Sequence, residues 1–281
     1  MSRVLLVTGA SSGLGQEIAV AAARAGYTVV ATVRDTRRAD GLRAAADEAG
    51  VALDVRRLDV TDEESIEECV TGVVADHGRL DVLVNNAGIA NTFATIETCP
   101  MATYRANIEV NFLGVVATTR AALPHLRASR GRVVTIGSTR GIVGQPFNEA
   151  YSAAKFAVEG FLESLAPTAA AMGVTVVVVA PGPVLNTSFG ANSGVTRESL
   201  LAEAGPYAEV LERYLDWVAR GRWPGAQTAG EVAEVVVKTL DDPDPPFRVM
   251  TSQWGEQYAR HKLVEADGRA VAAMTRSWVE G

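Results

Sequence analysis

Short apolar runs alternate along the chain with longer segments in which apolar residues recur every three or four positions. The short runs are rich in Val, and one of them, Val174–Ala180, is apolar at nearly every position. A strand that is apolar on both faces is typical of a parallel sheet covered by helices. The strands predicted from these runs are Val4–Val7, Thr28–Val33, Leu53–Leu58, Val82–Asn85, Arg132–Ile136, Thr175–Ala180 and Arg248–Met250.

The longer segments have helical periodicity, and most are rich in Ala. The helices predicted from them are Gly13–Ala25, Arg37–Ala49, Glu63–His77, Tyr104–Arg127, Tyr151–Met172 and Ala229–Leu240. Strand–helix alternation sustained over this length indicates βαβ units with right-handed crossovers. We therefore predict a single α/β domain over residues 1–281, a Rossmann-type doubly wound parallel sheet of about seven strands with helices on both faces.

One segment, residues 186–228, breaks this alternation. It is rich in Gly, Ser and Glu, yet it carries several aromatic residues. It follows the carboxyl end of a predicted strand, which is where doubly wound folds bind ligands. We therefore predict a substrate lid with its own helix near Arg197–Arg220. Residues 254–281 have helical character and predict a C-terminal helical extension.

Composition narrows the class of protein. The net charge of −7 and the sequence pI of about 5.1 argue against a nucleic-acid partner. The apolar runs are too short for a signal peptide or a membrane span. Cys69 and Cys99 stand in unrelated contexts, which favours a reducing, cytoplasmic compartment. The three His residues are scattered, so no metal site is predicted.

A glycine-rich turn follows the first predicted strand. Its sequence is Thr8-Gly9-Ala10-Ser11-Ser12-Gly13-Leu14-Gly15, and a predicted helix begins within it. Glycines allow the backbone to approach a ligand, and the amino end of a helix favours a pyrophosphate. The spacing differs from the common GxGxxG, and a tight turn without a ligand is the alternative. The candidate cofactor residues here are Gly9, Ser11, Ser12, Gly13, Leu14 and Gly15.

The end of the second predicted strand indicates which dinucleotide is bound. An acidic residue there binds the ribose 2′-hydroxyl of NAD, whereas an Arg accommodates the 2′-phosphate of NADP. Arg34 comes first, and Asp35 should point elsewhere. We therefore favour NADP(H) over NAD(H), with a solvated surface charge as the alternative for Arg34. After the third strand, Asp59 and Val60 are candidates for the adenine site, although Asp59 also suits a helix cap.

Residues suited to carbonyl chemistry follow the fourth and fifth predicted strands. Asn86, Ala87 and Gly88 are expected beside the cofactor, and Ser138 follows the fifth strand. Tyr151 and Lys155 are four residues apart and so share one helix face. A Tyr hydroxyl with a pKa near ~10 needs a nearby cation, such as a Lys ammonium, to act as an acid or base at neutral pH.

The order and spacing of these motifs resemble the short-chain dehydrogenase/reductase family over roughly residues 3–250. The shared motifs are Thr8–Gly15, Asn85–Gly88, Asn111, Ser138, Tyr151 with Lys155, and Pro181-Gly182-Pro183-Val184. The resemblance implies an NADP(H)-dependent oxidoreductase that interconverts an alcohol and a ketone or aldehyde. It also implies a catalytic tetrad of Asn111, Ser138, Tyr151 and Lys155, in which Asn111 binds a water that links the Lys to solvent. A helix-interior Asn satisfied by backbone is the alternative for Asn111.

A narrower resemblance points to the hydroxysteroid and retinol dehydrogenase branch. It is carried by Ala31–Asp35, Gly137–Asn148 and Lys155–Gly160. That branch prefers NADP(H) and has a Ser at the position of Ser12 that helps to bind the 2′-phosphate. The resemblance further implies that Tyr151, Lys155, Pro181, Gly182 and Val184 contact the cofactor.

The chain departs from the family pattern at two places. Asn186 stands where the family has a Thr that holds the nicotinamide, so either Asn186 or Thr187 is expected to make that contact. Arg140 and Gln145 are polar where the branch is often apolar, which argues against a strictly apolar steroid or retinoid. The candidate substrate residues are Arg140, Gln145, Phe147, Phe189 and Trp217.

Two other classes of protein are weighed against an enzyme of this type. A non-catalytic NADP-binding regulatory protein would be expected to have lost part of the tetrad. A Rossmann methyltransferase would need no Tyr-x3-Lys pair, and it would have an acidic residue in place of Arg34. The expected partner is a small carbonyl or alcohol substrate. The two long central helices resemble those of the family's four-helix interface, which implies a homodimer or homotetramer.

Overall fold

A computed structural model describes residues 2–90, 93–185, 196–220, 225–264 and 277. The strands are β1 (Val4–Val7), β2 (Thr28–Val33), β3 (Asp54–Arg57), β4 (Val82–Asn85), β5 (Arg132–Ile136), β6 (Thr175–Ala180), β7 (Val184–Leu185), β8 (Gln227–Thr228) and β9 (Arg248–Met250). The α-helices are α1 (Gly13–Arg24), α2 (Asp40–Ala49), α3 (Glu63–His77), α4 (Met101–Ile108), α5 (Gly114–Ser129), α6 (Glu149–Ala171), α8 (Arg197–Glu203), α9 (Ala208–Arg220), α10 (Ala229–Asp241) and α11 (Gln253–Leu263).

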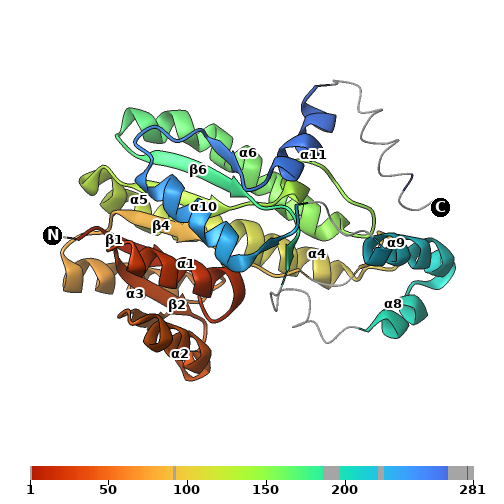
Figure 1. Cartoon of the computed structure of the whole chain (residues 1–281), viewed down its shortest axis with the longest axis horizontal. Coiled ribbons are helices and arrows are strands. Elements are labelled where there is room, and N and C mark those ends of the chain that lie inside the picture. The colour runs from red at the N-terminus through yellow and green to blue at the C-terminus, as the bar shows by residue number, and fades with distance from the viewer. Residues whose placement is uncertain (1, 91–92, 186–195, 221–224, 265–276, 278–281) are drawn as a thin grey trace.

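The central sheet has seven strands in the order β3-β2-β1-β4-β5-β6-β9, and every neighbouring pair is parallel. The chain order reverses between β1 and β4, which is the point where open α/β sheets bind ligands. The predicted doubly wound parallel sheet is therefore confirmed. The carboxyl ends of its strands point toward the end of the molecule that carries α8 and α9 (Figure 1).

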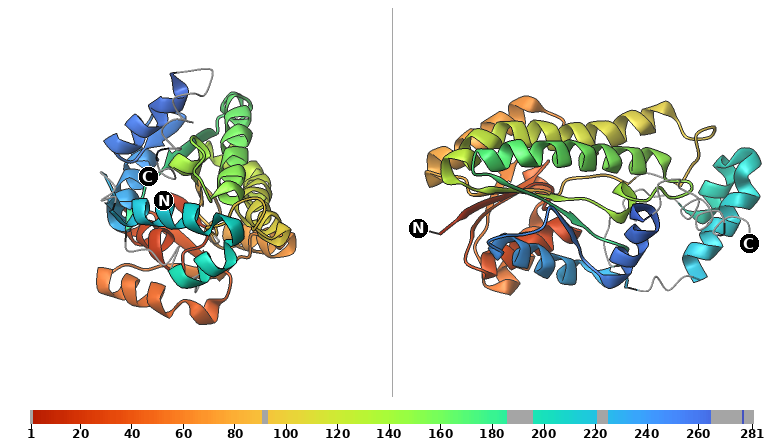
Figure 2. Two further views of the ribbon diagram at one scale, coloured as in Figure 1. Left: turned by 90° about the vertical axis from the view of Figure 1, so that its right-hand side faces the viewer. Right: turned by 90° about the horizontal axis from the view of Figure 1, so that it is seen from above.

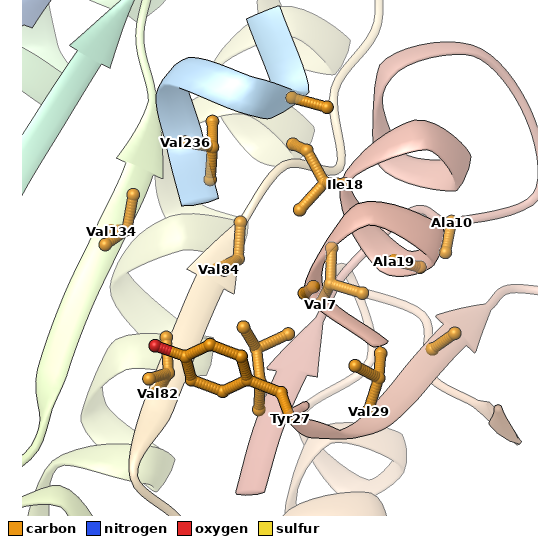
Figure 3. Packing of buried hydrophobic residues seen from close by; sticks show 14 of the residues in the cluster. Val7, Ala10, Ile18, Ala19, Tyr27, Val29, Val82, Val84, Val134 and Val236 are labelled. Atoms are coloured by element: carbon orange, nitrogen blue, oxygen red, sulfur yellow. The ribbon is translucent and has the colours of Figure 1, made fainter. Parts of the chain in front are cut away.

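Helices cover both faces of the sheet because the central strands β1, β2, β4, β5 and β6 bury side chains on both sides. Leu5 and Val7 of β1 join a core beneath α1 and α10, where Ile18 and Val236 also lie (Figure 3). Leu6, between them, points to the opposite core, beneath α3, α5 and α6. The view from above in Figure 2 shows these two helical layers with the sheet between them. This explains the continuous apolar strands.

The long helix predicted over Tyr104–Arg127 is divided. α4 begins earlier, at Met101, and a π-helical turn over Glu109–Leu113 separates it from α5. A π turn inserts one extra residue and shifts the side chains that follow around the helix, often at functional sites. Asn111 lies in this turn, and Gly114 follows it against Val60, where an added Cβ would be 2.9 Å from the Val60 Cβ.

The predicted lid contains two helices instead of one. α8 and α9 are separated by a short 3-10 turn over Gly205–Tyr207, which includes Pro206. Two short strands that sequence analysis missed, β7 and β8, pair in parallel and join the two ends of the inserted segment. A third apolar cluster lies between α9, α11 and the segment that follows β5, with Tyr214 at its centre and fully buried.

A helix that crosses a bilayer needs about 20 predominantly apolar residues in succession. The longest described helix, α6, has 23 residues, and its sequence includes Glu149, Lys155, Glu159 and Glu163. None of the helices in the described part of the chain is long and apolar enough to span a membrane.

Leu162 provides a test of this core. Its side chain is fully buried between α6 and the sheet. Leu162→Ala should lower the free energy of unfolding by about 3 kcal/mol, because the substitution removes apolar contact and leaves a cavity. Leu263 on α11 is 62% exposed, and Leu263→Ala should change that free energy by less than about 0.5 kcal/mol. Urea denaturation of both variants checks this, and equal losses would contradict the assigned packing of α6.

Candidate active site

The glycine-rich turn after β1 meets the end of β4 backbone to backbone. The Thr8 hydroxyl accepts hydrogen bonds from the backbone N–H groups of Asn86 and Ala87, both at 3.0 Å. The Asn86 side chain donates to the carbonyls of Thr8 and Gly9, at 2.9 and 3.1 Å. A Cβ on Gly9 would lie 2.8 Å from the Ala87 Cα, and Gly9 has φ of +69°. Glycine is therefore required there by space and by conformation.

The amino end of α1 fits a phosphate group. Ser12 occupies the N-cap position but makes no side-chain capping hydrogen bond, and the first turn of α1 has no acidic residue. The side chains of Ser11 and Ser12 are exposed. Gly15 follows, so close to Gly9 that an added Cβ would lie 2.4 Å from the Gly9 carbonyl oxygen. These uncapped N–H groups and hydroxyls could hold the pyrophosphate of a dinucleotide.

The end of β2 separates Arg34 from Asp35. Arg34 is exposed and forms no hydrogen bond or ion pair with the described residues. Asp35 accepts two hydrogen bonds from the Arg37 guanidinium, both at 3.0 Å, and one from the Arg37 backbone. These bonds hold the pKa of the Asp35 carboxyl below its usual value. Asp35 is thus engaged locally, whereas Arg34 remains available to a ligand.

Asp59 closes a turn after β3 and does not cap the next helix. Its carboxylate accepts hydrogen bonds from the backbone and hydroxyl of Thr61, at 3.0 and 2.8 Å. The N-cap of α3 is Asp62, which accepts from the Ser65 N–H at 3.1 Å. Asp62, and not Asp59, is therefore the residue that caps α3. Val60 lies beside Gly114 at the start of α5, so the adenine-site candidates border the π turn.

Tyr151 and Lys155 lie buried near the start of α6, with 7% and 5% of their surfaces exposed. Tyr151 hydrogen-bonds the side chain of Ser138, which follows β5. The Lys155 ammonium donates to the Ile136 carbonyl at 2.9 Å, and its nitrogen is 5.9 Å from the centre of the Tyr151 ring. The fold therefore brings Ser138, Tyr151 and Lys155 together, as the sequence predicts.

Burial disfavours the charged form of both groups. It raises the pKa of Tyr151, and this outweighs the lowering effects of the Arg140 charge and the Ser138 hydrogen bond. It lowers the pKa of Lys155 to about 8, against which the Glu159 carboxylate acts. We expected Lys155 to lower the pKa of Tyr151, but the cation with that effect is Arg140. Its guanidinium carbon lies 5.7 Å from the centre of the Tyr151 ring.

The Asn111 side chain is fully buried and holds the backbone after Gly88. Its amide accepts from the Ile89 N–H and donates to the Ile89 carbonyl, both at 2.9 Å, and also donates to the Asn107 side chain at 3.0 Å. A Cβ on Gly88 would lie 2.8 Å from the Asn111 oxygen. The side chain therefore has the backbone-satisfied arrangement that was the alternative, and a water relay at Asn111 stays a prediction.

Four of the candidate substrate residues fall in the described part of the chain. Arg140 donates from Nε to the buried Gln145 side chain at 2.7 Å. Phe147 is buried against Tyr214, with ring centres 5.6 Å apart, and its φ is +56°. Trp217 stacks on the other side of this cluster, 6.2 Å from Tyr214. Phe147 therefore builds the wall of the lid cluster, and Arg140 is the polar candidate nearest Tyr151.

The Pro181-Gly182 segment is covered by α11. A Cβ on Gly182 would lie 3.2 Å from the Trp254 ring, and Trp254 stacks on Tyr258 with ring centres 4.9 Å apart. The Pro181 carbonyl accepts from the Thr139 N–H at 2.9 Å, which links this segment to the Ser138 turn. Val184 lies in β7. Asn186, Thr187 and Phe189 lie outside the described residues.

Two groups that support the site, Glu159 and Tyr258, were not predicted from the sequence. The Glu159 carboxylate is buried, packs beside Gly137 and Gly141, and accepts two hydrogen bonds from Arg248 of β9, at 3.0 and 2.6 Å. Tyr258 of α11 is hydrogen-bonded to Gln145 at 3.3 Å. Glu159 stands one helical turn after Lys155, which was a usable signal. No comparable signal in the sequence connects Tyr258 to the site. Among the described residues, no cluster suited to a metal ion is found.

The lowered pKa of Lys155 predicts a pH-dependent stability. Between about pH 8 and the ordinary value of 10.5, the unfolded chain binds this proton and the folded chain does not, so stability rises with pH. Lys155→Met removes the contribution. Between about pH 7.5 and 9.5, the free energy of unfolding of the wild type should therefore increase by roughly 2 kcal/mol relative to that of Lys155→Met. Urea denaturation measures this. The exposed Lys238→Met is the control, and a difference that is constant with pH would contradict the prediction.

Comparison with known proteins agrees with this geometry. Residues 3–197 match the family model of the short chain dehydrogenases. Retinol dehydrogenase 8 of Bos taurus is 36% identical over 259 residues, which are 89% of this chain and 81% of that protein. The 17-beta-hydroxysteroid dehydrogenase type 1 of Homo sapiens is 34% identical over 285 residues, which are 97% of this chain and 85% of that protein.

The fold leads to the same family. The crystal structure of a short-chain dehydrogenase from Streptomyces avermitilis superposes with a TM-score of 0.76 at 32% identity, covering 99% of this chain and 98% of that one. The short-chain dehydrogenases are a family of oxidoreductases, and their fold binds a nicotinamide cofactor. The chain therefore belongs to the short-chain dehydrogenase/reductase family, in its hydroxysteroid and retinol dehydrogenase branch.

Proposed function

We propose that this protein is an NADP(H)-dependent oxidoreductase that interconverts a secondary alcohol and a ketone or aldehyde, with Tyr151 as the general acid and base. The observation that carries the proposal is the burial of Tyr151 and Lys155 on one face of α6 beside Ser138. A proton donor, a hydrogen-bond donor for the substrate oxygen and a buried cation are what the proton half of carbonyl reduction needs.

A bound nicotinamide cofactor supplies the hydride in reduction and accepts it in oxidation. In the reduction, Ser138 holds the carbonyl oxygen while Tyr151 donates the proton to it. Tyr151 is the third residue of α6, so the positive end of the helix favours its phenolate, as does Arg140. Lys155, held on the Ile136 carbonyl, returns a proton to the phenolate and presents donors to the cofactor ribose. In oxidation the proton moves the opposite way.

The preference for NADP(H) rests on the end of β2. Arg34 is exposed and available, and a guanidinium binds a 2′-phosphate with two hydrogen bonds. Asp35, which would favour NAD by binding the ribose hydroxyl, is already held by Arg37. Ser12, exposed at the uncapped end of α1, is the second phosphate ligand we assign.

The remaining proposals concern the parts around this centre. Residues 186–228 form the lid over the substrate, and the third apolar cluster anchors the described part of it to α11. The whole chain acts as one Rossmann-fold domain, in which α11 completes the site from the C-terminal side. The assembly is a homodimer or homotetramer through the long helices α5 and α6.

Replacing Tyr151 tests the reaction. Tyr151→Phe should lower the rate of cofactor-dependent carbonyl reduction by about 100-fold or more, because the proton donor is lost. Binding of NADPH should change little. Steady-state kinetics and fluorescence titration measure the two. Tyr27→Phe is the control, since the Tyr27 hydroxyl bonds Asp241 far from this site. Tight NADPH binding by a wild type that reduces no carbonyl compound would instead assign the chain to a regulatory role.

Replacing Arg34 tests the cofactor. Arg34→Asp should weaken NADPH binding roughly 10- to 100-fold, because it removes a charge-assisted contact with the 2′-phosphate, and should leave NADH binding the same or tighter. Fluorescence titration with both cofactors measures the dissociation constants. Arg43→Asp, on the exposed side of α2, is the charge-matched control. Wild-type binding of NADH as tight as NADPH would overturn the NADP assignment and leave the proposed acid–base chemistry standing.

A further inference from the structure

Arg140 lies beside the proposed proton donor. It is in the short 3-10 turn over Thr139–Gly141, and its backbone N–H donates to the Ser138 side chain at 3.1 Å. The guanidinium carbon is 5.7 Å from the centre of the Tyr151 ring. Burial raises the pKa values of Tyr151, Tyr214 and Tyr258, and the Arg140 charge opposes this rise at each of them. Arg140 is therefore a cation among buried tyrosines, at the position where a carbonyl substrate would react.

The guanidinium is held in place through only one of its nitrogens. Its Nε donates to the side-chain oxygen Oε1 of Gln145 at 2.7 Å, and the side-chain nitrogen Nε2 of Gln145 donates to the Tyr258 hydroxyl at 3.3 Å. Gln145 and Tyr258 are buried, so they fix the guanidinium from behind. Its two terminal nitrogens form no hydrogen bond or ion pair with the described residues. Two parallel N–H donors on one guanidinium match the two oxygens of a carboxylate.

No carboxylate among the described residues neutralises Arg140. Two carboxylates nearby have partners through one oxygen each, since the buried Glu159 binds Arg248 and the partly buried Glu149 accepts from Thr95 at 2.8 Å, and neither forms an ion pair with Arg140. A partly buried cation is costly unless an anion pairs with it. The chain as a whole carries a net charge of −7, which opposes the approach of an anion. Recognition of an anionic substrate therefore needs a local, oriented cation of this kind.

We propose that Arg140 binds a carboxylate of the substrate, so that the preferred substrates are oxo acids, or the corresponding hydroxy acids, with the carboxylate a few bonds from the reacting carbon. This inference rests on the proposed function and names its substrate class. Gln145 and Tyr258 act as positioning residues, because Gln145 binds the guanidinium and Tyr258 holds Gln145. The hydride still goes to the carbonyl carbon and the proton of Tyr151 to its oxygen, so the carboxylate takes no part in the bond changes.

The test compares acids with their own neutral esters. NADPH-dependent reduction is measured for straight-chain oxo carboxylic acids, with the oxo group at increasing distance from the carboxylate, and for the methyl ester of each. The readout is the ratio of kcat/KM for acid to that for ester, because this ratio cancels any effect on the chemical step common to both. For the best pair, the wild type should prefer the acid by roughly 10- to 100-fold.

Three variants and one control complete the design. In Arg140→Met the acid should lose its advantage, so that acid and ester are reduced with about equal kcat/KM. In Gln145→Glu, a nearly isosteric change, a carboxylate beside Nε neutralises the guanidinium, so the preference should fall while Arg140 remains. Arg43→Met, on exposed α2, should keep the wild-type ratio. Thermal unfolding confirms that each variant is folded, and Arg140→Lys should restore part of the preference, since an ammonium keeps the charge without the paired donors.

The outcomes separate the two proposals. If esters and acids are reduced equally by the wild type, or if the acid preference persists in Arg140→Met, this inference is overturned and the proposed function stands. If both substrates lose the same factor in Arg140→Met, Arg140 acts on Tyr151 alone and the inference is again overturned. If nothing is reduced, the proposed function fails. Protection of the wild type, but not of Arg140→Met, from thermal unfolding by a straight-chain carboxylate lacking the oxo group would then still support the binding site.

Discussion

The contact between the glycine turn and the end of β4 is the constraint on which the site depends. β1 and β4 are neighbours at the point where the strand order reverses, and their carboxyl ends must approach without side chains between them. Thr8 and Asn86 supply the hydrogen bonds that close this approach. The same contact orients the amino end of α1 and fixes the position of Gly88, which follows β4. A single backbone junction thus places the phosphate-binding and the reacting halves of the site relative to each other.

The electrostatics of the centre follow one rule. Tyr151 and Lys155 are both buried, and burial opposes the charged form of each. At each of them, one charged residue opposes this effect of burial. Arg140 favours the phenolate of Tyr151, and the Glu159 carboxylate favours the ammonium of Lys155. Each partner is itself fixed by a residue from late in the chain, Tyr258 through Gln145 and Arg248 directly. The two proton-handling groups are therefore tuned by the C-terminal part of the protein.

The sheet and the grouping of Ser138, Tyr151 and Lys155 could be predicted because they depend on local patterns. Continuous apolar runs predict buried parallel strands, and a spacing of four predicts a shared helix face. The π turn at Asn111 could not be predicted, because no local pattern marks it, and the contacts of Asn111 in the fold are with Ile89, which belongs to another segment of the chain. For a similar reason, the lowering effect on the pKa of Tyr151 was attributed to Lys155, whereas in the fold it comes from Arg140. Which charge lies nearest is a property of tertiary packing.

The ion pair between Glu159 and Arg248 joins residues 89 positions apart, and Arg248 lies on the edge strand β9. The strands from β1 to β6 emerge from the ribosome before Arg248, and α10, which completes one of the two cores, emerges between β6 and Arg248. Until Arg248 emerges, Glu159 lacks the guanidinium that hydrogen-bonds its carboxylate beneath the Ser138 turn. The nascent chain thus supplies β1 to β6 before it supplies Arg248 and then Tyr258 of α11, so the reaction centre is finished by the C-terminal part of the chain.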